Sequence, residues 1–363
     1  MAVIGLLSDG GDMSVTRQTV VRTAAAAFYR ARGHKLLAPF TRGCGAILML
    51  HSISAEPRPA FDPNGGLCVT PDFLERAICL VRREGYDVVS LDEVHQRLTS
   101  GSAGKPFVAF TLDDGYRDNL KLAYPIFQRH QVPFCVYVPT AFADGRADLW
   151  WYGLEGAIRS GRTLRLAIDG SEQEFTVSSL AEQRRAWQQI YWWLRRIGED
   201  QARQTVTSLC AQAGLDTTRL AQELIMTWQD VRQLAADPLC TIGAHTVNHS
   251  SLAKLDANRC GEEIIACKTE LELRLGKPVR HFSYPYGSPA DAGQREFALA
   301  AEAGFATAVT TRKGLIFKEH RAHLTALPRL SLNGGAQDER LLAVLLGGAP
   351  FALVNGFRRV STA

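Results

Sequence analysis

A short apolar run that stops at two adjacent acidic residues constrains the fold of this chain more than any other feature. Residues 107–111, FVAFT, have the composition of a strand buried on both faces, as in a parallel sheet, and Leu112 comes next. Asp113, Asp114 and Gly115 follow directly. Neighbouring carboxylates repel each other and suit a strand interior poorly, whereas a metal ion or a proton transfer would account for them. A polar Asp-Gly turn without a function is the alternative.

Strands and helices alternate along most of the chain, which indicates a parallel sheet with right-handed crossovers. The further strands that we expect are residues 45–50, 86–90, 132–140, 240–244, 279–284, 306–310 and 327–332. The main helices expected between them are residues 71–84, 90–98, 118–130, 256–275 and 290–303. A length of 363 residues fits either two domains or one α/β barrel with insertions.

Residues 150–226 interrupt this alternation. They predict a hairpin at 163–177, with its turn near Asp169, followed by helices at 180–197 and 199–213. We therefore expect an inserted, mainly helical subdomain between two parts of one barrel. The expected division is an N-terminal tail with a basic amphipathic helix (1–44), the first part of the barrel (45–149), the insertion (150–226), the second part of the barrel (227–335) and a C-terminal tail (336–363).

The composition narrows the range of partners. With 46% hydrophobic and 21% charged residues the chain is expected to be globular, and a net charge of +4 gives no indication of nucleic-acid binding. No apolar run has the length of a membrane span, and the first residues lack the features of a secretory signal, so we expect a cytoplasmic protein. The eight cysteines include no CxxC pair and are expected to be reduced thiols.

A basic helix expected at residues 14–37 leaves two interpretations open. Such a helix usually packs on the outside of its own domain, and we favour that interpretation. The alternative is that it lies on an anionic lipid surface, which would give the protein a peripheral contact with the inner face of the membrane.

Polar residues follow three of the expected strands. They are Asp113 with Asp114, His245 with His249, and Pro285 with Tyr286. In a parallel α/β barrel these strand ends lie on one face, where active sites are built. Two imidazoles four residues apart can face one metal ion, and with one carboxylate they form a common zinc set. That spacing also occurs by chance, but its place opposite an acidic pair favours a metal site.

The acidic pair then allows two different tasks. A bound metal lowers the pKa of water and polarises a carbonyl group. One aspartate would hold the metal, and the other would accept the proton of the attacking water. The backbone N–H of Tyr286 would stabilise the developing oxyanion, and Pro285 would make that turn rigid. A turn without a catalytic role is the alternative for this third motif.

These motifs, in this order, resemble those of the polysaccharide deacetylases with the NodB-homology domain, which form carbohydrate esterase family four. The motifs stand at 111–115 (TLDDG), 245–249 (HTVNH) and 282–287 (FSYPYG), and the resemblance covers about residues 46–140 and 227–332. It implies an irregular (β/α) barrel of about seven strands. It further implies a site whose members are a catalytic base (Asp113), three ligands of a divalent metal, most often zinc (Asp114, His245 and His249), and an oxyanion contact (Tyr286).

Some residues outside the matching motifs are additional candidates. Ser283 stands where many family members have an arginine that orients the base, and we expect Arg329 to reach that place from the last strand. No residue clearly matches the late general acid of the family. His320 and His323 are the late candidates, but their polar loop favours surface histidines. His51, at the end of the first strand, either contacts substrate or has a structural role, which we favour.

The function implied by the resemblance is the metal-dependent removal of N-acetyl groups from an amino sugar in a glycan or glycan precursor. The bond hydrolysed would be a C–N amide bond outside a peptide. Two alternatives are the hydrolysis of another amide on the same fold, such as a formamide or a cyclic amide, and a non-catalytic carbohydrate-binding protein. The intact acidic and histidine motifs argue against the last, because a binding protein needs neither a metal site nor a base.

Overall fold

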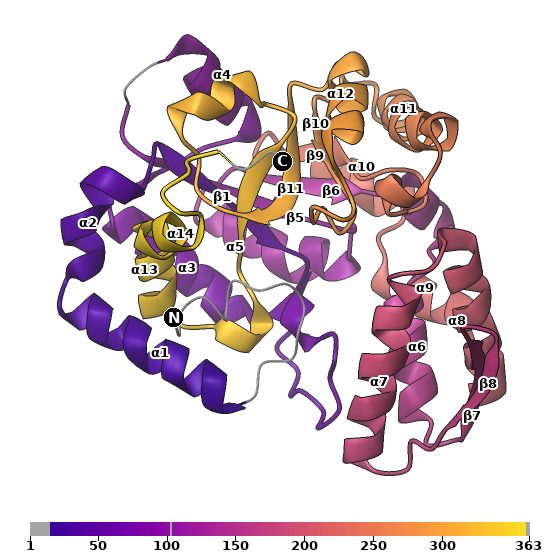
Figure 1. The fold of residues 1–363 in the computed structure, drawn as a ribbon. Helices are drawn as coiled ribbons and strands as arrows, with labels where there is room; N and C mark the ends of the chain where they lie inside the picture. The colour runs from indigo at the N-terminus through magenta and orange to yellow at the C-terminus, as the bar shows by residue number, and fades with distance from the viewer. Residues whose placement is uncertain (1–14, 102–103, 361–363) are drawn as a thin grey trace.

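The computed structural model describes residues 15–101 and 104–360, and its centre is a closed barrel of parallel strands (Figure 1). The strand order is β1, β12, β11, β10, β9, β6 and β5, and β5 pairs with β1 to close the barrel. The bounds are β1 (Gly45–Leu50), β5 (Phe107–Leu112), β6 (Phe134–Val138), β9 (Cys240–Ala244), β10 (His281–Ser283), β11 (Thr307–Lys313) and β12 (Leu327–Ser331). The predicted (β/α) barrel of about seven strands is therefore confirmed.

The registers of the barrel strands bring the motif residues together. Leu50 lies opposite Leu112 across β1 and β5, so the residues that follow, His51 and Asp113, leave the barrel side by side. All six residues of β1 and all six of β5 are buried, as expected for strands covered on both faces.

Short additional strands lie outside the barrel. The strand expected at residues 86–90 is only two residues long, β4 (Asp87–Val88), and it pairs with the first residues of β5. A further pair, β2 (Ser52–Ile53) and β3 (Cys68–Val69), was not predicted. Both are too short to show a periodic sequence pattern.

The helices of the barrel surround the strands (Figure 1). They are α3 (Pro71–Arg83), α4 (Leu91–Ser100), α5 (Tyr124–Arg129), α10 (Trp228–Ala235), α11 (Ala257–Leu275) and α12 (Gln294–Glu302). The first turn of α3 is capped, because the Thr70 side chain accepts a hydrogen bond from the Phe73 N–H and Pro71 occupies the first turn. The helix predicted at 118–130 begins instead with a π-helical segment, Asn119–Ala123.

The chain ends form four helices on one side of the barrel. They are α1 (Val15–Arg30), α2 (Gly33–Thr41), α13 (Glu339–Leu346) and α14 (Ala349–Val354). The single helix predicted at 14–37 is thus wrong over its described part, because the backbone turns at Arg32, whose φ is 55°. The described part of the C-terminal tail expected at residues 336–363 includes α13, whose Leu341 and Leu342 are buried.

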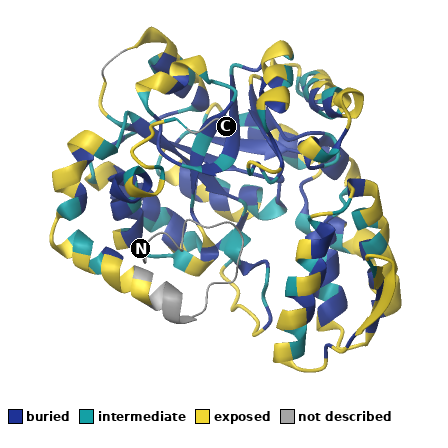
Figure 2. Ribbon diagram, in the orientation of Figure 1, coloured by how far each residue is buried: buried dark blue, intermediate teal, exposed yellow. Residues whose placement is uncertain are grey.

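The insertion has its own hydrophobic core (Figure 2). It consists of α6 (Trp150–Arg159), β7 (Leu164–Ile168), β8 (Ser171–Phe175), α7 (Leu180–Leu194), α8 (Glu199–Ala213) and α9 (Thr217–Leu224). The predicted hairpin is β7 with β8, and its turn residues Asp169 and Gly170 have φ values of 50° and 81°. The mainly helical insertion is therefore confirmed.

Two further expectations concern the whole chain. All eight cysteines are free thiols in the structure. Within residues 15–101 and 104–360, no helix combines the length and the apolar character that a membrane span requires.

Candidate active site

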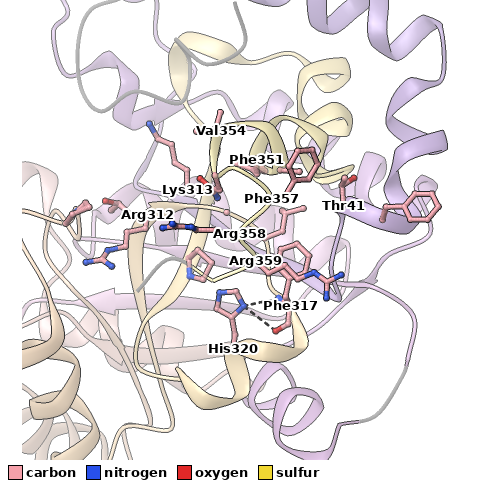
Figure 3. A pocket seen from close by; sticks show the side chains of 18 of the residues that line it. Thr41, Arg312, Lys313, Phe317, His320, Phe351, Val354, Phe357, Arg358 and Arg359 are labelled. Carbon is pink, nitrogen blue, oxygen red and sulfur yellow. Dashed lines mark hydrogen bonds between the residues drawn. The ribbon is translucent and has the colours of Figure 1, made fainter. Parts of the chain in front are cut away.

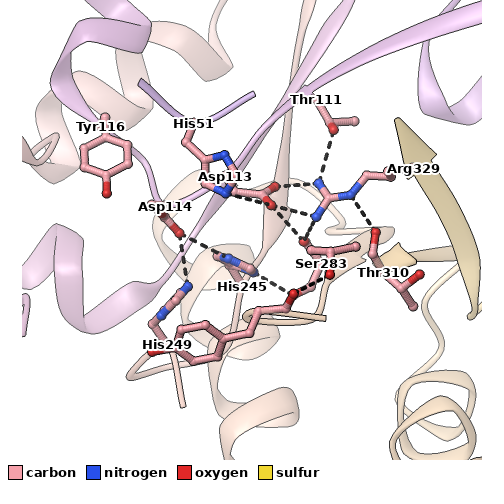
Figure 4. Close-up of polar contacts among 12 residues, drawn as sticks. His51, Thr111, Asp113, Asp114, Tyr116, His245, His249, Ser283, Thr310 and Arg329 are labelled. Atoms are coloured by element: carbon pink, nitrogen blue, oxygen red, sulfur yellow. Dashed lines mark hydrogen bonds and ion pairs between the residues drawn. The ribbon is translucent and has the colours of Figure 1, made fainter. Parts of the chain in front are cut away.

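Two motifs that are far apart in the sequence meet at the carboxyl ends of β5 and β9. Asp114 follows β5, and His245 and His249 follow β9. One potential ligand atom of each residue lies within 4.8 Å of the other two, and all three side chains are buried. Figure 4 shows both imidazole rings directed at the Asp114 carboxylate. Among the described residues this is the one such group of histidine, cysteine and carboxylate side chains.

The contacts of His245 identify which nitrogen faces Asp114. Its Nδ1 lies 2.6 Å from the carbonyl oxygen of Ser283, which can only accept a hydrogen bond, so Nδ1 carries the hydrogen. In the neutral ring the Nε2 atom therefore presents a lone pair, and it lies 3.3 Å from Asp114 Oδ1. Two acceptors that face each other without a hydrogen between them need a cation.

His249 fits the same interpretation. Its Nε2 lies 3.1 Å from Asp114 Oδ1, and burial lowers the pKa of its imidazole, which keeps the ring neutral. Asp114 Oδ1 is itself buried and accepts no hydrogen bond from the described residues. Two neutral imidazoles and one carboxylate, with their lone pairs converging, are suited to a divalent metal such as zinc. The residues present thus fit the metal that the sequence predicts.

The backbone at these motifs adopts an uncommon conformation. Asp114, Thr246, His249 and Tyr286 have φ values of 71°, 63°, 56° and 60°. Residues other than glycine held in the left-handed region cost about 1–3 kcal/mol each, and they persist where the surrounding structure fixes them. Here the Thr246 hydroxyl accepts a hydrogen bond from the His249 N–H at 2.9 Å. This clustering of strained residues is typical of a functional site.

Asp113 is held by Arg329 from the last strand of the barrel. The Nη1 atom of Arg329 donates to Asp113 Oδ1 and its Nη2 atom donates to Oδ2, both at 2.7 Å. Nε of Arg329 donates to the Thr310 carbonyl at 2.9 Å, and Nη2 also donates to the Ser283 hydroxyl at 3.0 Å. The guanidinium fork therefore fixes the plane of the carboxylate.

The same contact controls the charge of Asp113. Burial acts to raise the pKa of its carboxyl group, but the charge and the hydrogen bonds of Arg329 outweigh burial, and the pKa lies below its usual value. Asp113 is thus ionised at neutral pH although it is only 2% exposed. An ionised carboxylate that is not a ligand of a metal ion can accept a proton.

Residues of the insertion hold the third motif in place. The indole Nε1 of Trp150 donates to the Tyr286 hydroxyl at 2.7 Å, and the Arg195 guanidinium lies 3.7 Å from the centre of the Tyr286 ring. Arg195 also forms an ion pair with the buried Asp291. The Tyr286 N–H donates to no other described backbone group, and Pro285 precedes it in the same turn.

The histidines outside the motifs separate into two groups. His51 reaches the site, and its Nε2 lies 4.0 Å from Asp113 Oδ2. His320 and His323 come shortly before β12 begins at Leu327, so they lie at the opposite end of the barrel from the site. The surface position expected for His320 is wrong, because this side chain is 1% exposed and its Nδ1 accepts a hydrogen bond from the Phe317 N–H.

Sequence reasoning missed the contacts that the insertion makes. Trp151 lies on α6, and the centre of its ring is 5.1 Å from the centre of the His249 ring. Arg195 directly follows α7. Neither residue belongs to a motif, and no pattern in the sequence shows which face of an insertion turns toward the barrel. The proximity of His51 to Asp113 could have been found, because closing the barrel requires β1 to lie next to another strand of the sheet.

Comparisons of the whole fold with solved structures find several deacetylases with a similar barrel. It is similar to the deacetylase PplD of Streptococcus pyogenes, in complex with acetate, with 18% identity, coverage of 83% of this chain and 97% of that chain, and a TM-score of 0.54. It is also similar to IcaB of Ammonifex degensii, with 15% identity, coverage of 84% of this chain and 97% of that chain, and a TM-score of 0.52. A third similar structure is a de-N-acetylase of Aggregatibacter actinomycetemcomitans, with 15% identity, coverage of 79% of this chain and 94% of that chain, and a TM-score of 0.51. At these identities the likeness shows a shared fold.

Comparison with family models adds a match to part of the chain. The model for polysaccharide deacetylases matches residues 181–308, which include His245, His249 and Tyr286. Residues 181–308 are therefore similar to a polysaccharide deacetylase domain. A comparison with curated protein sequences finds no match. The acidic pair Asp113–Asp114 lies outside the matched range. In the folded barrel Asp114 lies next to the two histidines.

Proposed function

We propose that this protein is a metal-dependent enzyme that hydrolyses the N-acetyl group of an amino sugar in a glycan or glycan precursor. The observation that carries the proposal is the separation of two adjacent carboxylates into two environments. Asp114 faces two imidazole nitrogens, whereas Asp113 faces Arg329 and His51. A site with both a metal ligand set and a free base is suited to attack by water on an amide carbonyl.

The metal would be held by Asp114, His245 and His249, and zinc is the ion that we expect. Lewis-acid activation of water and of the acetyl carbonyl is the chemistry that such an ion supplies when bound. The three side chains leave coordination positions open for water and substrate, as in other catalytic zinc sites with three protein ligands.

Asp113 would act as the general base. It takes the proton of the attacking water, and Arg329 holds its carboxylate in a fixed plane throughout. The N–H of Tyr286 would donate to the oxyanion that develops on the acetyl oxygen, with Pro285 fixing the turn. The strained φ of 60° at Tyr286 fixes the direction of that N–H before substrate binds.

His51 would act as the general acid. Its side chain is 18% exposed, compared with 3% for Asp113, so it faces the solvent side of the site. Breaking the C–N bond expels an amine, which leaves readily only when its nitrogen is protonated. His51 would give that proton, so that water and amide yield acetate and the free amine. His320 and His323 are at the far end of the barrel and have no part in this step.

The acetyl group is proposed as the acyl group that is removed. The family resemblance suggests it, and one similar solved structure supports it. The solved structure of the Streptococcus pyogenes deacetylase contains acetate, which is the product that hydrolysis of an N-acetyl group would release. For this chain we infer acetate as the acid product. The amino sugar itself is inferred from the family.

The test compares three variants on chitooligosaccharides and other N-acetylated amino sugars, with acetate release as the measurement. Asp113→Asn should retain one equivalent of zinc and lose activity by about 10²-fold or more. His249→Gln should lose both zinc and activity. Arg185→Glu, an exposed position in the insertion, should change neither. Release of formate from N-formyl sugars, with none of acetate, would contradict the proposal, and so would full activity in metal-free protein.

A further inference from the structure

Exposed apolar side chains gather on two neighbouring helices near the ends of the chain. On α2, Leu36 is 72% exposed and Phe40 is 77% exposed. On α14 and just after it, the values are 68% for Leu353 and 73% for Phe357. The two helices lie side by side, since the Thr41 hydroxyl donates to the Gly347 carbonyl at 2.5 Å. Large apolar side chains grouped in this way mark an interaction surface.

A cavity of about 330 Å³ opens between these helices and the end of β11. Its lining contains four cationic side chains and no aspartate or glutamate. The cationic residues are Arg312, Lys313, Arg358 and Arg359, and Figure 3 shows them around the cavity with Phe317, Phe351 and Phe357. The cavity thus combines aromatic walls with positive charge, which suits a molecule that is both apolar and anionic.

Some of the charges at this surface are compensated within the chain. Arg359 pairs with Glu319 at 2.9 Å, and Lys35 on α2 pairs with Glu84 at 3.1 Å. Arg358 is exposed, and its side chain forms no hydrogen bond or ion pair with another described residue. A second copy of the same cationic surface would repel this one. A surface of opposite charge would be attracted, and its apolar layer would receive the exposed leucine and phenylalanine side chains.

We propose that α2, α14 and the residues after α14 bind an anionic phospholipid bilayer, with a headgroup phosphate in the cationic cavity. Exposed apolar side chains enter the boundary between headgroups and acyl chains, and lysine and arginine side chains bind the phosphates, as for peripheral helices in general. Figure 1 shows α2 and α14 on the left of the barrel and the insertion on its right, so the bound bilayer would leave the insertion uncovered. The inference goes beyond the proposed function and does not depend on it.

The experiment is co-sedimentation of the full chain with vesicles. Vesicles of phosphatidylcholine with phosphatidylglycerol should sediment the protein, and vesicles of phosphatidylcholine alone should not. The double variant Phe40→Ser/Phe357→Ser and the single variant Arg358→Glu should each weaken binding by about tenfold or more. These residues lie on the surface, so circular dichroism and acetate release should remain as in the unmodified protein.

Matched controls come from exposed positions elsewhere. Leu273→Ser removes a leucine that is 76% exposed on α11, and Arg185→Glu reverses a charge in the insertion. Both should sediment with anionic vesicles as the unmodified protein does. Equal binding to the two kinds of vesicle, or no loss with Arg358→Glu, would overturn the proposal. A dimer that Phe40→Ser/Phe357→Ser dissociates, without any vesicle binding, would also overturn it and would identify a contact between copies.

Discussion

Arg329 is among the largest fully buried side chains of the described structure, and it forms an ion pair with a single carboxylate, that of Asp113. A buried ion pair costs desolvation energy on both sides, so it gives little net stability compared with apolar residues. Its use here is better explained by orientation. The two parallel hydrogen bonds to Asp113 allow one carboxylate plane, and the Thr310 carbonyl fixes the guanidinium in turn.

Replacing Arg329 by methionine should change both stability and pH dependence. Asp113 would become an unpaired buried charge, and the expected loss in the free energy of unfolding is about 3–5 kcal/mol. Without Arg329, burial raises the pKa of Asp113, so the acid limb of kcat/KM should move to higher pH. Urea unfolding and a pH–rate profile measure the two effects. Arg329→Lys keeps the charge and should shift the limb less; an unchanged limb in both variants would contradict the role of Arg329.

His51 offers a test that separates proton donation from binding. His51→Gln should hydrolyse an N-acetyl amide about 10²–10⁴-fold more slowly, because the expelled amine lacks its proton donor. Hydrolysis of 4-nitrophenyl acetate should fall much less, since nitrophenolate leaves without protonation. Steady-state rates on both substrates, with zinc content as the control, give the answer. Equal losses on amide and ester would indicate that His51 positions substrate or has a structural role.

At the scale of elements, the segment that follows β5 carries a half-buried acid outside the site, Asp118. Asp118 accepts hydrogen bonds from the Ser52 hydroxyl at 2.6 Å and from the Asn119 amide at 2.9 Å. Burial nevertheless raises the pKa of Asp118 to about 6. The folded state therefore holds this proton more tightly than the unfolded chain, in which the pKa is about 3.9.

The sign of the pH effect follows from these two pKa values. The favourable contribution of Asp118 is complete below about pH 4 and is lost as the pH rises through about 6, with a maximum near 3 kcal/mol. Asp118→Asn should therefore be more stable than the unmodified protein at pH 7 by about 1–3 kcal/mol, and the difference should vanish near pH 4. Chemical denaturation at the two pH values measures it. A difference that stays constant with pH would show that Asp118 keeps an ordinary pKa.

The insertion provides the second prediction at this scale, because its residues hold Tyr286. Arg195→Met removes the cation over the Tyr286 ring and the partner of Asp291. The N–H of Tyr286 should then be less well placed, and kcat should fall by about tenfold with little change in zinc content. Arg196→Met, at the neighbouring exposed position, is the matched control and should have normal kcat. Normal kcat in Arg195→Met would show that the barrel alone places Tyr286.

At the scale of the whole molecule, the barrel was predictable because β1, β5, β6 and β9 are largely apolar runs. The motif residues were predictable for the same reason, since they follow the ends of the runs at Leu112 and Ala244. The break in the helix at Arg32 was not predictable. It depends on the packing of the Phe28 ring against Gly33, where a Cβ atom would lie 2.2 Å from that ring. The contacts of Trp150 and Arg195 depend on how the insertion folds back, and helical periodicity contains no information on that.

The metal ligands come from strands that are joined only through the folded barrel, so metal binding should stabilise the whole molecule. Asp114 and His245 are separated by the insertion and by β6, and the unfolded chain cannot bring them together. Zinc at about 100 times its Kd should add about 2.7 kcal/mol to the free energy of unfolding and raise Tm by several degrees.

Differential scanning fluorimetry of metal-free protein, with and without added zinc, measures this shift. Asp114→Asn and His249→Gln should abolish the rise in Tm, because each removes a ligand. Asp113→Asn should retain it, since Asp113 faces Arg329 and not the ligand set. The three variants together separate the two carboxylates without any measurement of activity. A rise that survives in Asp114→Asn and disappears in Asp113→Asn would exchange the tasks that we assign to the two residues.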